Sequence, residues 1–124
     1  MTHTVFIDGE AGTTGLKILE RLQGRDDIKL IHLSDDHRKA IGARTEALNV
    51  ADVSILCLPE NASREAISLM NNYAGRVIDT SIAFRTDPGW VFGFPEYGPG
   101  QRDKIKDAKR VTNPGCYSCG AIAI

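Results

Sequence analysis

A glycine-rich turn between two regular patterns limits most strongly what this chain can fold into. Residues 4–8 are an apolar run of β-formers, and leucines recur at helical spacing over residues 16–22. Gly9, Gly12 and Gly15 lie between them. Strand, glycine turn and helix form the context of a dinucleotide-binding turn, in which the backbone bends tightly and a diphosphate meets the helix N-terminus. The alternative is a plain strand-to-helix turn whose glycines serve only packing.

Short apolar runs alternate with helical patterns through the first 112 residues. We expect further strands over 28–33, 51–58, 76–79 and 110–112, and a helix from Asn61 or Ser63 to about Tyr73. Residues 40–49 carry a weak pattern that fits either a helix or a loop. Residues 84–100, rich in aromatic side chains, indicate an ordered loop or a short strand. The alternation predicts an α/β fold: a Rossmann-like, doubly wound, mostly parallel sheet with helices on both faces.

Ligands of such sheets bind outside the carboxyl ends of the strands, so the predicted cofactor site gathers the turns at that edge. The candidate cofactor-binding residues are Gly9, Gly12, Thr13, Thr14, Gly15, Ser34, Arg38, Lys39, Leu58, Pro59 and Ser81. The loop after the second strand contains groups that suit a ribose 2′-phosphate, namely Ser34, Arg38 and Lys39, and also two aspartates that suit a 2′-hydroxyl. A loop of merely solvated charges is a third interpretation.

The pentapeptide Asn113-Pro-Gly-Cys-Tyr117 reads as a helix start that carries a thiol. Asn113 suits the N-cap and proline the first helical position, which places Cys116 over unpaired N–H groups. That field favours the nucleophilic thiolate, although a buried and inert cysteine is an equally good interpretation of the residues alone. Cys116 and Cys119 also form a C-x-x-C pair, which could be a redox dithiol or half of a zinc site. No other cysteine or histidine stands at a spacing typical of zinc, and a thioredoxin-like dithiol would follow an early strand. Cys57, inside an apolar run, is expected to be inert.

The composition narrows the class of protein. With 124 residues, a formal net charge of −1 and 25% charged residues, the chain is ordinary for one globular domain and offers nothing that favours nucleic acid or a membrane surface. The three cysteines show no disulfide-framework spacing, which fits a reducing cytoplasm. The sequence stops inside the apolar run 120–124, so we expect a fragment of a longer protein.

Five motifs together resemble one enzyme family. They are the glycine turn 9–15, Val77-Ile-Asp-Thr-Ser81, Phe84-Arg85, Gly93-Phe-Pro-Glu96 and the cysteine pentapeptide 113–117. In this order and spacing they resemble the shorter type of N-acetyl-gamma-glutamyl-phosphate reductase. The related aspartate-semialdehyde dehydrogenases share the glycine turn and a catalytic cysteine but not the wording of the pentapeptide. Ser118 and Cys119 depart from the proline-containing wording of many family members.

The resemblance implies NADPH-dependent reduction of N-acetyl-glutamyl 5-phosphate to N-acetyl-glutamate 5-semialdehyde, in arginine biosynthesis. It implies that Cys116 is the nucleophile, that Arg85 and Asn113 bind the acyl-phosphate substrate, and that NADP is the cofactor. Residues 1–112 would then form the NADP-binding domain, and residues 113–124 the start of a substrate domain. The family's acid/base histidine has no counterpart here, so the fragment is expected to be inactive, and the full-length enzyme to be a homo-oligomer. The alternatives are a non-catalytic dinucleotide-binding module and a related reductase of the aspartate-semialdehyde-dehydrogenase type.

Overall fold

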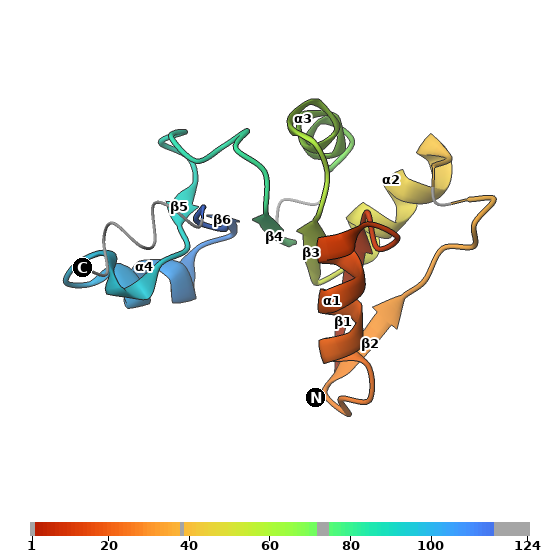
Figure 1. The fold of residues 1–124 in the computed structure, drawn as a ribbon, viewed down its shortest axis with the longest axis horizontal. Helices are drawn as coiled ribbons and strands as arrows, with labels where there is room; N and C mark the ends of the chain where they lie inside the picture. Colours follow the sequence, from red (N-terminus) through yellow and green to blue (C-terminus); the bar gives the residue numbers. More distant parts are fainter. Residues whose placement is uncertain (1, 38, 72–74, 116–124) are drawn as a thin grey trace.

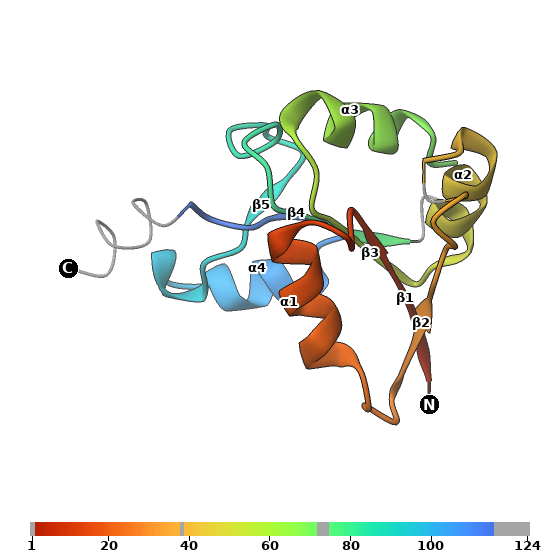
Figure 2. The same cartoon turned by 45° about the vertical axis from the view of Figure 1, so that its right-hand side comes forward.

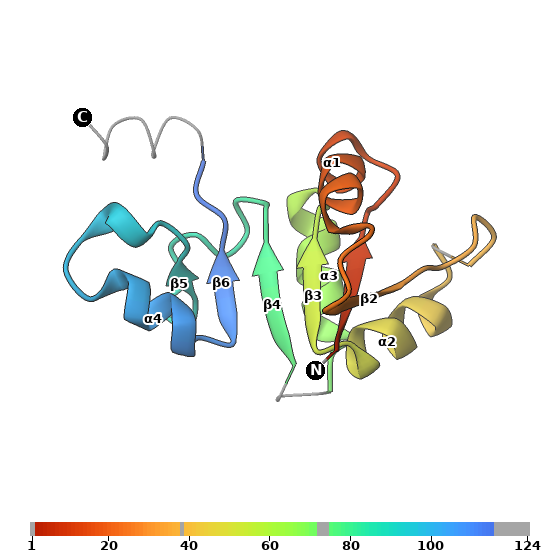
Figure 3. The same ribbon diagram turned by 90° about the horizontal axis from the view of Figure 1, so that it is seen from below.

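A computed structural model describes residues 2–37, 39–71 and 75–115. In that part of the chain, six parallel strands form one sheet in the order β2-β1-β3-β4-β6-β5 (Figure 1), and Figure 3 shows their arrows pointing the same way. The strands are β1 (His3–Asp8), β2 (Ile28–Ile31), β3 (Val53–Leu56), β4 (Arg76–Asp79), β5 (Val91–Phe92) and β6 (Arg110–Thr112). The predicted parallel sheet is therefore confirmed, and no antiparallel strand accompanies it within the described residues.

Helices cover both faces of this sheet, as the sequence predicts. They are α1 (Thr13–Leu22), α2 (Ile41–Val50), α3 (Glu60–Ser68) and α4 (Gln101–Asp107), with a short 3₁₀ turn η1 (Pro95–Tyr97). Figure 2 shows α2 and α3 on one side of the sheet, and α1 and α4 on the other. The arrangement follows from right-handed crossovers, because the chain leaves β1 towards β2 and then returns past β1 to β3. The reversal beside β1 makes the sheet doubly wound.

The main core lies between the sheet and the pair α2 and α3. Phe6, Leu48, Leu56, Ala66 and Val77 belong to one buried cluster contributed by strands and these two helices. The burial of such side chains is the main favourable term in folding. The α1 face is more open, since Gly15 is the only buried residue of α1 and the first-turn Leu16 is half exposed.

The strand register aligns the carboxyl ends of β1, β3, β4 and β6 at one edge of the sheet. Asp8 pairs with Leu56, Leu56 with Asp79, and Asp79 with Thr112, so these four residues form a buried row across the strand ends. The turns that follow β1, β3, β4 and β6 consequently begin at one level along the same edge. In the described residues, no helix is long and apolar enough to cross a membrane.

Several predicted boundaries were wrong. The second strand ends at Ile31 and the third spans only Val53–Leu56, because the flanking apolar residues lie outside the paired register of the sheet. The third helix begins at Glu60 with Pro59 as its N-cap residue and no side-chain cap, and it ends at Ser68. Ser63, expected as a possible cap, is instead buried inside that helix.

Candidate functional site

The turn after β1 requires glycine at two positions because other backbone atoms lie against them. Gly9 has φ +90°, and a Cβ there would lie 2.4 Å from the Cys57 carbonyl oxygen. A Cβ on Gly15 would lie 2.2 Å from the Gly9 carbonyl oxygen. The same oxygen accepts a hydrogen bond from the Gly12 N–H at 3.0 Å. The turn therefore closes around the Gly9 carbonyl, and neither Gly9 nor Gly15 can carry a side chain without a shift of backbone.

Gly12 differs, since the protein itself leaves room there. It is the N-cap residue of α1 with φ −78°, and a Cβ would have a single neighbour within 4 Å, the Gly9 carbonyl oxygen at 3.4 Å. The first turn of α1 contains no acidic residue and its N-cap makes no side-chain hydrogen bond. Thr13 and Thr14, in that turn, are exposed. The helix N-terminus thus keeps uncapped N–H groups and a favourable field for an anion.

A pocket of about 380 Å³ opens beside this turn, at the carboxyl ends of β1, β2 and β3. Among the predicted cofactor residues, Gly9, Gly12, Lys39 and Leu58 line it. The remaining wall consists of Phe6, Ile7, Asp8, Glu10, Ala11, Leu33 and Arg44. The pocket lies where a doubly wound sheet reverses direction, which is the usual place for a ligand of this architecture.

Three charged wall residues were missed from the sequence. Arg44 in α2 is buried and donates from Nη2 to the Asp8 carboxylate at 2.8 Å. Glu10 is largely covered, and its carboxylate lies 2.9 Å from Nδ1 of the exposed His32. Asp8 stands at the end of a predicted strand and could have been proposed on that ground. Arg44 lies in a weak helical pattern in which nothing marks an arginine for burial.

The other predicted cofactor residues that the structure describes lie outside the pocket wall. Ser34 is exposed, and its hydroxyl lies 2.7 Å from Nδ1 of His37. Ser81 follows β4 and donates from Oγ to the Asp79 carboxylate at 2.7 Å. Pro59 precedes α3, and Gly15 is packed inside the turn. Arg38 lies outside the described residues.

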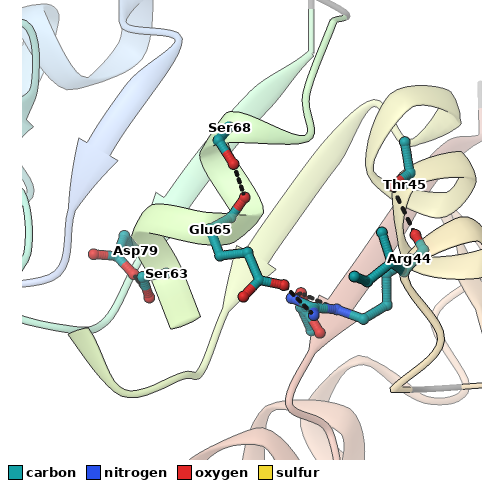
Figure 4. A network of polar contacts seen from close by, with 8 residues as sticks. Arg44, Thr45, Ser63, Glu65, Ser68 and Asp79 are labelled. Atoms are coloured by element: carbon teal, nitrogen blue, oxygen red, sulfur yellow. Dashed lines mark hydrogen bonds and ion pairs between the residues drawn. The ribbon is translucent and has the colours of Figure 1, made fainter. Parts of the chain in front are cut away.

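A buried carboxylate organises the loop after β4. Asp79 is fully buried, and its two oxygens accept hydrogen bonds from Ser63 Oγ at 2.8 Å and from Ser81 Oγ at 2.7 Å. Figure 4 shows Ser63 and Asp79 meeting between α3 and the sheet. Ser81 Oγ also accepts the Ala83 N–H at 3.1 Å. A buried carboxylate is tolerated only with such partners, so this network fixes the start of the loop.

Arg85 links this loop to the approach of the cysteine turn. Its Nη2 donates to the Thr80 carbonyl at 3.1 Å and its Nε to the Asn113 carbonyl at 3.2 Å. Asn113 in turn donates its N–H to the Asp79 carbonyl at 2.8 Å. A Cβ on Gly115 would lie 2.9 Å from Arg85 Nη1, so a side chain there would displace the guanidinium. The predicted substrate residues Arg85 and Asn113 are thus in contact with each other.

The cysteines differ in how much of them can be described. Cys116, Cys119 and all but the first two residues of the helix expected to begin at Pro114 lie outside the described residues. Cys57 follows β3, where burial raises the pKa of its thiol to about 11, with the nearby Asp79 and Asp8 carboxylates acting in the same direction. That environment suppresses the thiolate and agrees with an inert Cys57. Within the described ranges, no group of three or more His, Cys, Asp or Glu side chains could hold a metal ion.

The fold and this edge of turns define a class, the α/β proteins with a Rossmann-type, doubly wound parallel sheet. The model matches aspartate semialdehyde dehydrogenase from Candida albicans, solved with NADP, with a TM-score of 0.67 and 14% identity over 99% of this chain and 45% of that one. Aspartate semialdehyde dehydrogenase II from Vibrio cholerae matches with a TM-score of 0.63 and 16% identity, over 98% of this chain and 44% of that one. At this identity the likeness concerns the fold alone.

Sequence relatives give the particular family. N-acetyl-gamma-glutamyl-phosphate reductase from Burkholderia lata is 57% identical over 121 residues, 98% of this chain, and reductase 2 of Nostoc sp. is 55% identical over 119 residues, 96% of the chain. The chain is homologous to the N-terminal part of these reductases, as the motifs indicated. It spans 38% and 37% of the length of these two relatives. No protein-family model matches the chain.

Proposed function

We propose that this chain is the dinucleotide-binding part of an NADP-dependent reductase that converts N-acetyl-glutamyl 5-phosphate to N-acetyl-glutamate 5-semialdehyde in arginine biosynthesis. The observation that carries the proposal is the turn after β1. Backbone atoms fill the space beside Gly9 and Gly15, whereas Gly12 leaves the N-terminus of α1 open beside a pocket. Such a turn suits a diphosphate, and the relatives at 53–57% identity bear the name of this reductase.

NADP, rather than NAD, is part of the same proposal. Lys39 lines the pocket, and Ser34 and Arg38 stand nearby in the sequence, so this loop supplies the basic and hydroxyl groups that a 2′-phosphate needs. The dehydrogenase from Candida albicans with the same fold was solved with NADP, which supports a nicotinamide dinucleotide here. The bound cofactor would supply the hydride for the reduction.

The chain's own residues would handle the acyl group. The Cys116 thiolate attacks the acyl carbon, the bond to the phosphate oxygen breaks, and a thioester forms as phosphate leaves. After hydride reaches the thioester carbon, its C–S bond breaks to release the aldehyde and the thiolate. Arg85 and Asn113 would bind the substrate, and their mutual hydrogen bond holds the segment before Cys116 against the loop after β4. We place this chemistry in the cytoplasm, where a thiol nucleophile stays reduced.

The cofactor is tested by titrating NADP and NAD separately onto the purified protein. We expect tighter binding of NADP, and Arg38→Ala should weaken it by about 1–3 kcal/mol while sparing NAD, as for a lost charged hydrogen bond. Arg102→Ala is the matched control, since Arg102 is an exposed arginine in α4, outside the pocket wall. Equal or tighter binding of NAD would overturn the choice of cofactor and would make Asp35 or Asp36 the candidate ribose ligand.

A further inference from the structure

A buried ion pair stands in the pocket wall directly before the glycine turn. Asp8 is 4% exposed and Arg44 is 9% exposed, and both line the pocket. Arg44 donates to the same Asp8 oxygen from Nη2 at 2.8 Å and from Nε at 3.2 Å. Figure 4 shows the Arg44 side chain reaching from α2 towards Glu65 of α3, whose carboxylate lies 3.5 Å from Nη1. Glu65 is half exposed, so Asp8 is the closer and better shielded partner.

The position of Asp8 creates an electrostatic problem for the proposed ligand. Its carboxylate precedes Gly9, the residue whose carbonyl the turn encloses, and Glu10 adds a second carboxylate to the same wall. A dinucleotide brings at least two phosphate charges to this place, and a poorly hydrated carboxylate repels them more strongly than an exposed one would. Glu10 has His32 as a partner, whereas the carboxylate of Asp8 is matched by Arg44.

We propose that Arg44 is a positioning residue for anion binding, which neutralises and orients Asp8 so that the wall below the glycine turn accepts the phosphates of a dinucleotide. The inference rests on the proposed function of this pocket. It differs from a purely structural role, in which the pair only ties α2 to β1, because the two roles predict opposite effects of removing Asp8. If the pair is only a structural tie, removing either Asp8 or Arg44 should weaken the protein in the same way. If the pair sets the charge of the pocket, removing Arg44 makes the wall more negative and removing Asp8 makes it more positive.

The experiment compares NADP dissociation constants for four forms of the protein by isothermal titration, with circular dichroism to establish folding. Arg44→Met should weaken NADP about tenfold or more, the scale of one uncompensated charge beside a partly shielded anion. Asp8→Asn should bind NADP as tightly as the wild type or more tightly, because Arg44 is then opposed only by the half-exposed and more distant Glu65. The double variant Asp8→Asn/Arg44→Met should return to within about threefold of the wild type, since neither charge remains.

Two further variants keep the inference falsifiable. Arg44→Lys preserves the charge and should preserve most of the affinity, and Arg102→Met, which removes a cation from an exposed site, should leave affinity unchanged. If Arg44→Met does not fold, Asp8→Asn and Arg44→Lys carry the test. Weaker binding by Asp8→Asn, or no recovery in the double variant, would overturn the role of Arg44 while the wild type still binds NADP. A wild type that binds no dinucleotide would instead overturn the proposed function and this inference together.

Discussion

The turn after β1 and the loop after β4 lie at the same edge of the sheet but are stabilised by different kinds of interaction. Around Gly9 and Gly15 the turn is held by backbone atoms in close contact, and the N-cap of α1 has no side-chain hydrogen bond. The loop after β4 is held by polar side chains, with Asp79 buried and hydrogen-bonded and Arg85 donating to two carbonyls. The turn after β1 should therefore lose stability when a side-chain atom is added, and the loop after β4 when a hydrogen-bonding group is removed.

The difference also indicates what each region is suited to bind. A turn made of backbone presents N–H groups that no side chain covers, which suits a phosphate common to many dinucleotides. A loop made of side-chain hydrogen bonds can hold a particular segment in place, here Asn113 to Gly115 before the cysteine. We infer that the first region serves the cofactor and the second serves the position of the nucleophile.

The largest expected effect comes from Gly15→Ala. In most helices this substitution is favourable by about 1 kcal/mol, but here the new Cβ would meet the Gly9 carbonyl oxygen at 2.2 Å. We expect a loss of about 3 kcal/mol or more in the free energy of unfolding, measured by urea titration. Gly42→Ala in α2 is the matched control, since nothing lies within 4 Å of its Cβ, and it should stabilise slightly. Equal stability of the two variants would contradict the packed-turn description.

Asp79→Ala tests the second region by removal. It leaves the Ser63 hydroxyl buried without its acceptor, which costs about 1–3 kcal/mol in the free energy of unfolding. Asp52→Ala serves as the control, because Asp52 also accepts two hydrogen bonds, from the N–H and hydroxyl of Thr4, but in an exposed place. Its loss should be clearly smaller in the same urea titration. A larger loss for Asp52→Ala would refute the idea that burial makes the Asp79 network costly to break.

Gly12→Val separates ligand binding from folding within the turn. A Cβ at Gly12 makes only an ordinary contact with the Gly9 carbonyl oxygen at 3.4 Å, and residue 12 is exposed, so we expect the unfolding free energy to change by less than about 1 kcal/mol. NADP binding should fall at least about tenfold, because the side chain would cover the N–H groups of α1 that a diphosphate needs. Gly12→Ala should lie between the wild type and Gly12→Val in affinity. Normal NADP binding by a folded Gly12→Val protein would show that the turn is only structural.

The smallest perturbation is alkylation, which compares the reactivity of the cysteine thiols. Cys57 lies between the two regions, with Asp8 and Asp79 both raising its thiol pKa beyond the effect of burial. With a pKa of about 11, only about one Cys57 in ten thousand is a thiolate at pH 7. Iodoacetamide should therefore label Cys116 before Cys57, and peptide mass mapping measures the order of labelling. Because the native pKa is raised, this thiol contributes stability below about pH 9 that is lost as the pH rises through 11.

The role of Cys116 is then checked in the complete enzyme. Cys116→Ser should abolish reduction, because serine is a far poorer nucleophile near neutral pH, whereas Cys119→Ser should keep most activity. Preferential labelling of Cys119, together with an active Cys116→Ser enzyme, would overturn the assignment and restore the dithiol interpretation.

Local patterns predicted the architecture because they report on burial and chain reversal. The run 4–8, the glycines of the turn and the strand at 76–79 each indicated their structure from neighbours in sequence. The start of α3 was misplaced because Ser63 looks like a cap locally, while its hydroxyl is used by Asp79 sixteen residues away. The cofactor list captured part of the pocket wall, since strand ends can be located from sequence, but the burial of Arg44 depends on β1 and α3.

The sequence by itself determined the parallel α/β plan, the edge of the sheet where the strand-end turns gather, and the resemblance to one enzyme family, because these depend on periodicity, glycine positions and ordered motifs. Tertiary structure alone decided which glycine leaves room beside the pocket and which lies against backbone. It also decided that Arg44 opposes Asp8 and that Arg85 contacts the Asn113 carbonyl. These facts rest on distances between segments remote in the chain, and only the folded register of the strands sets such distances.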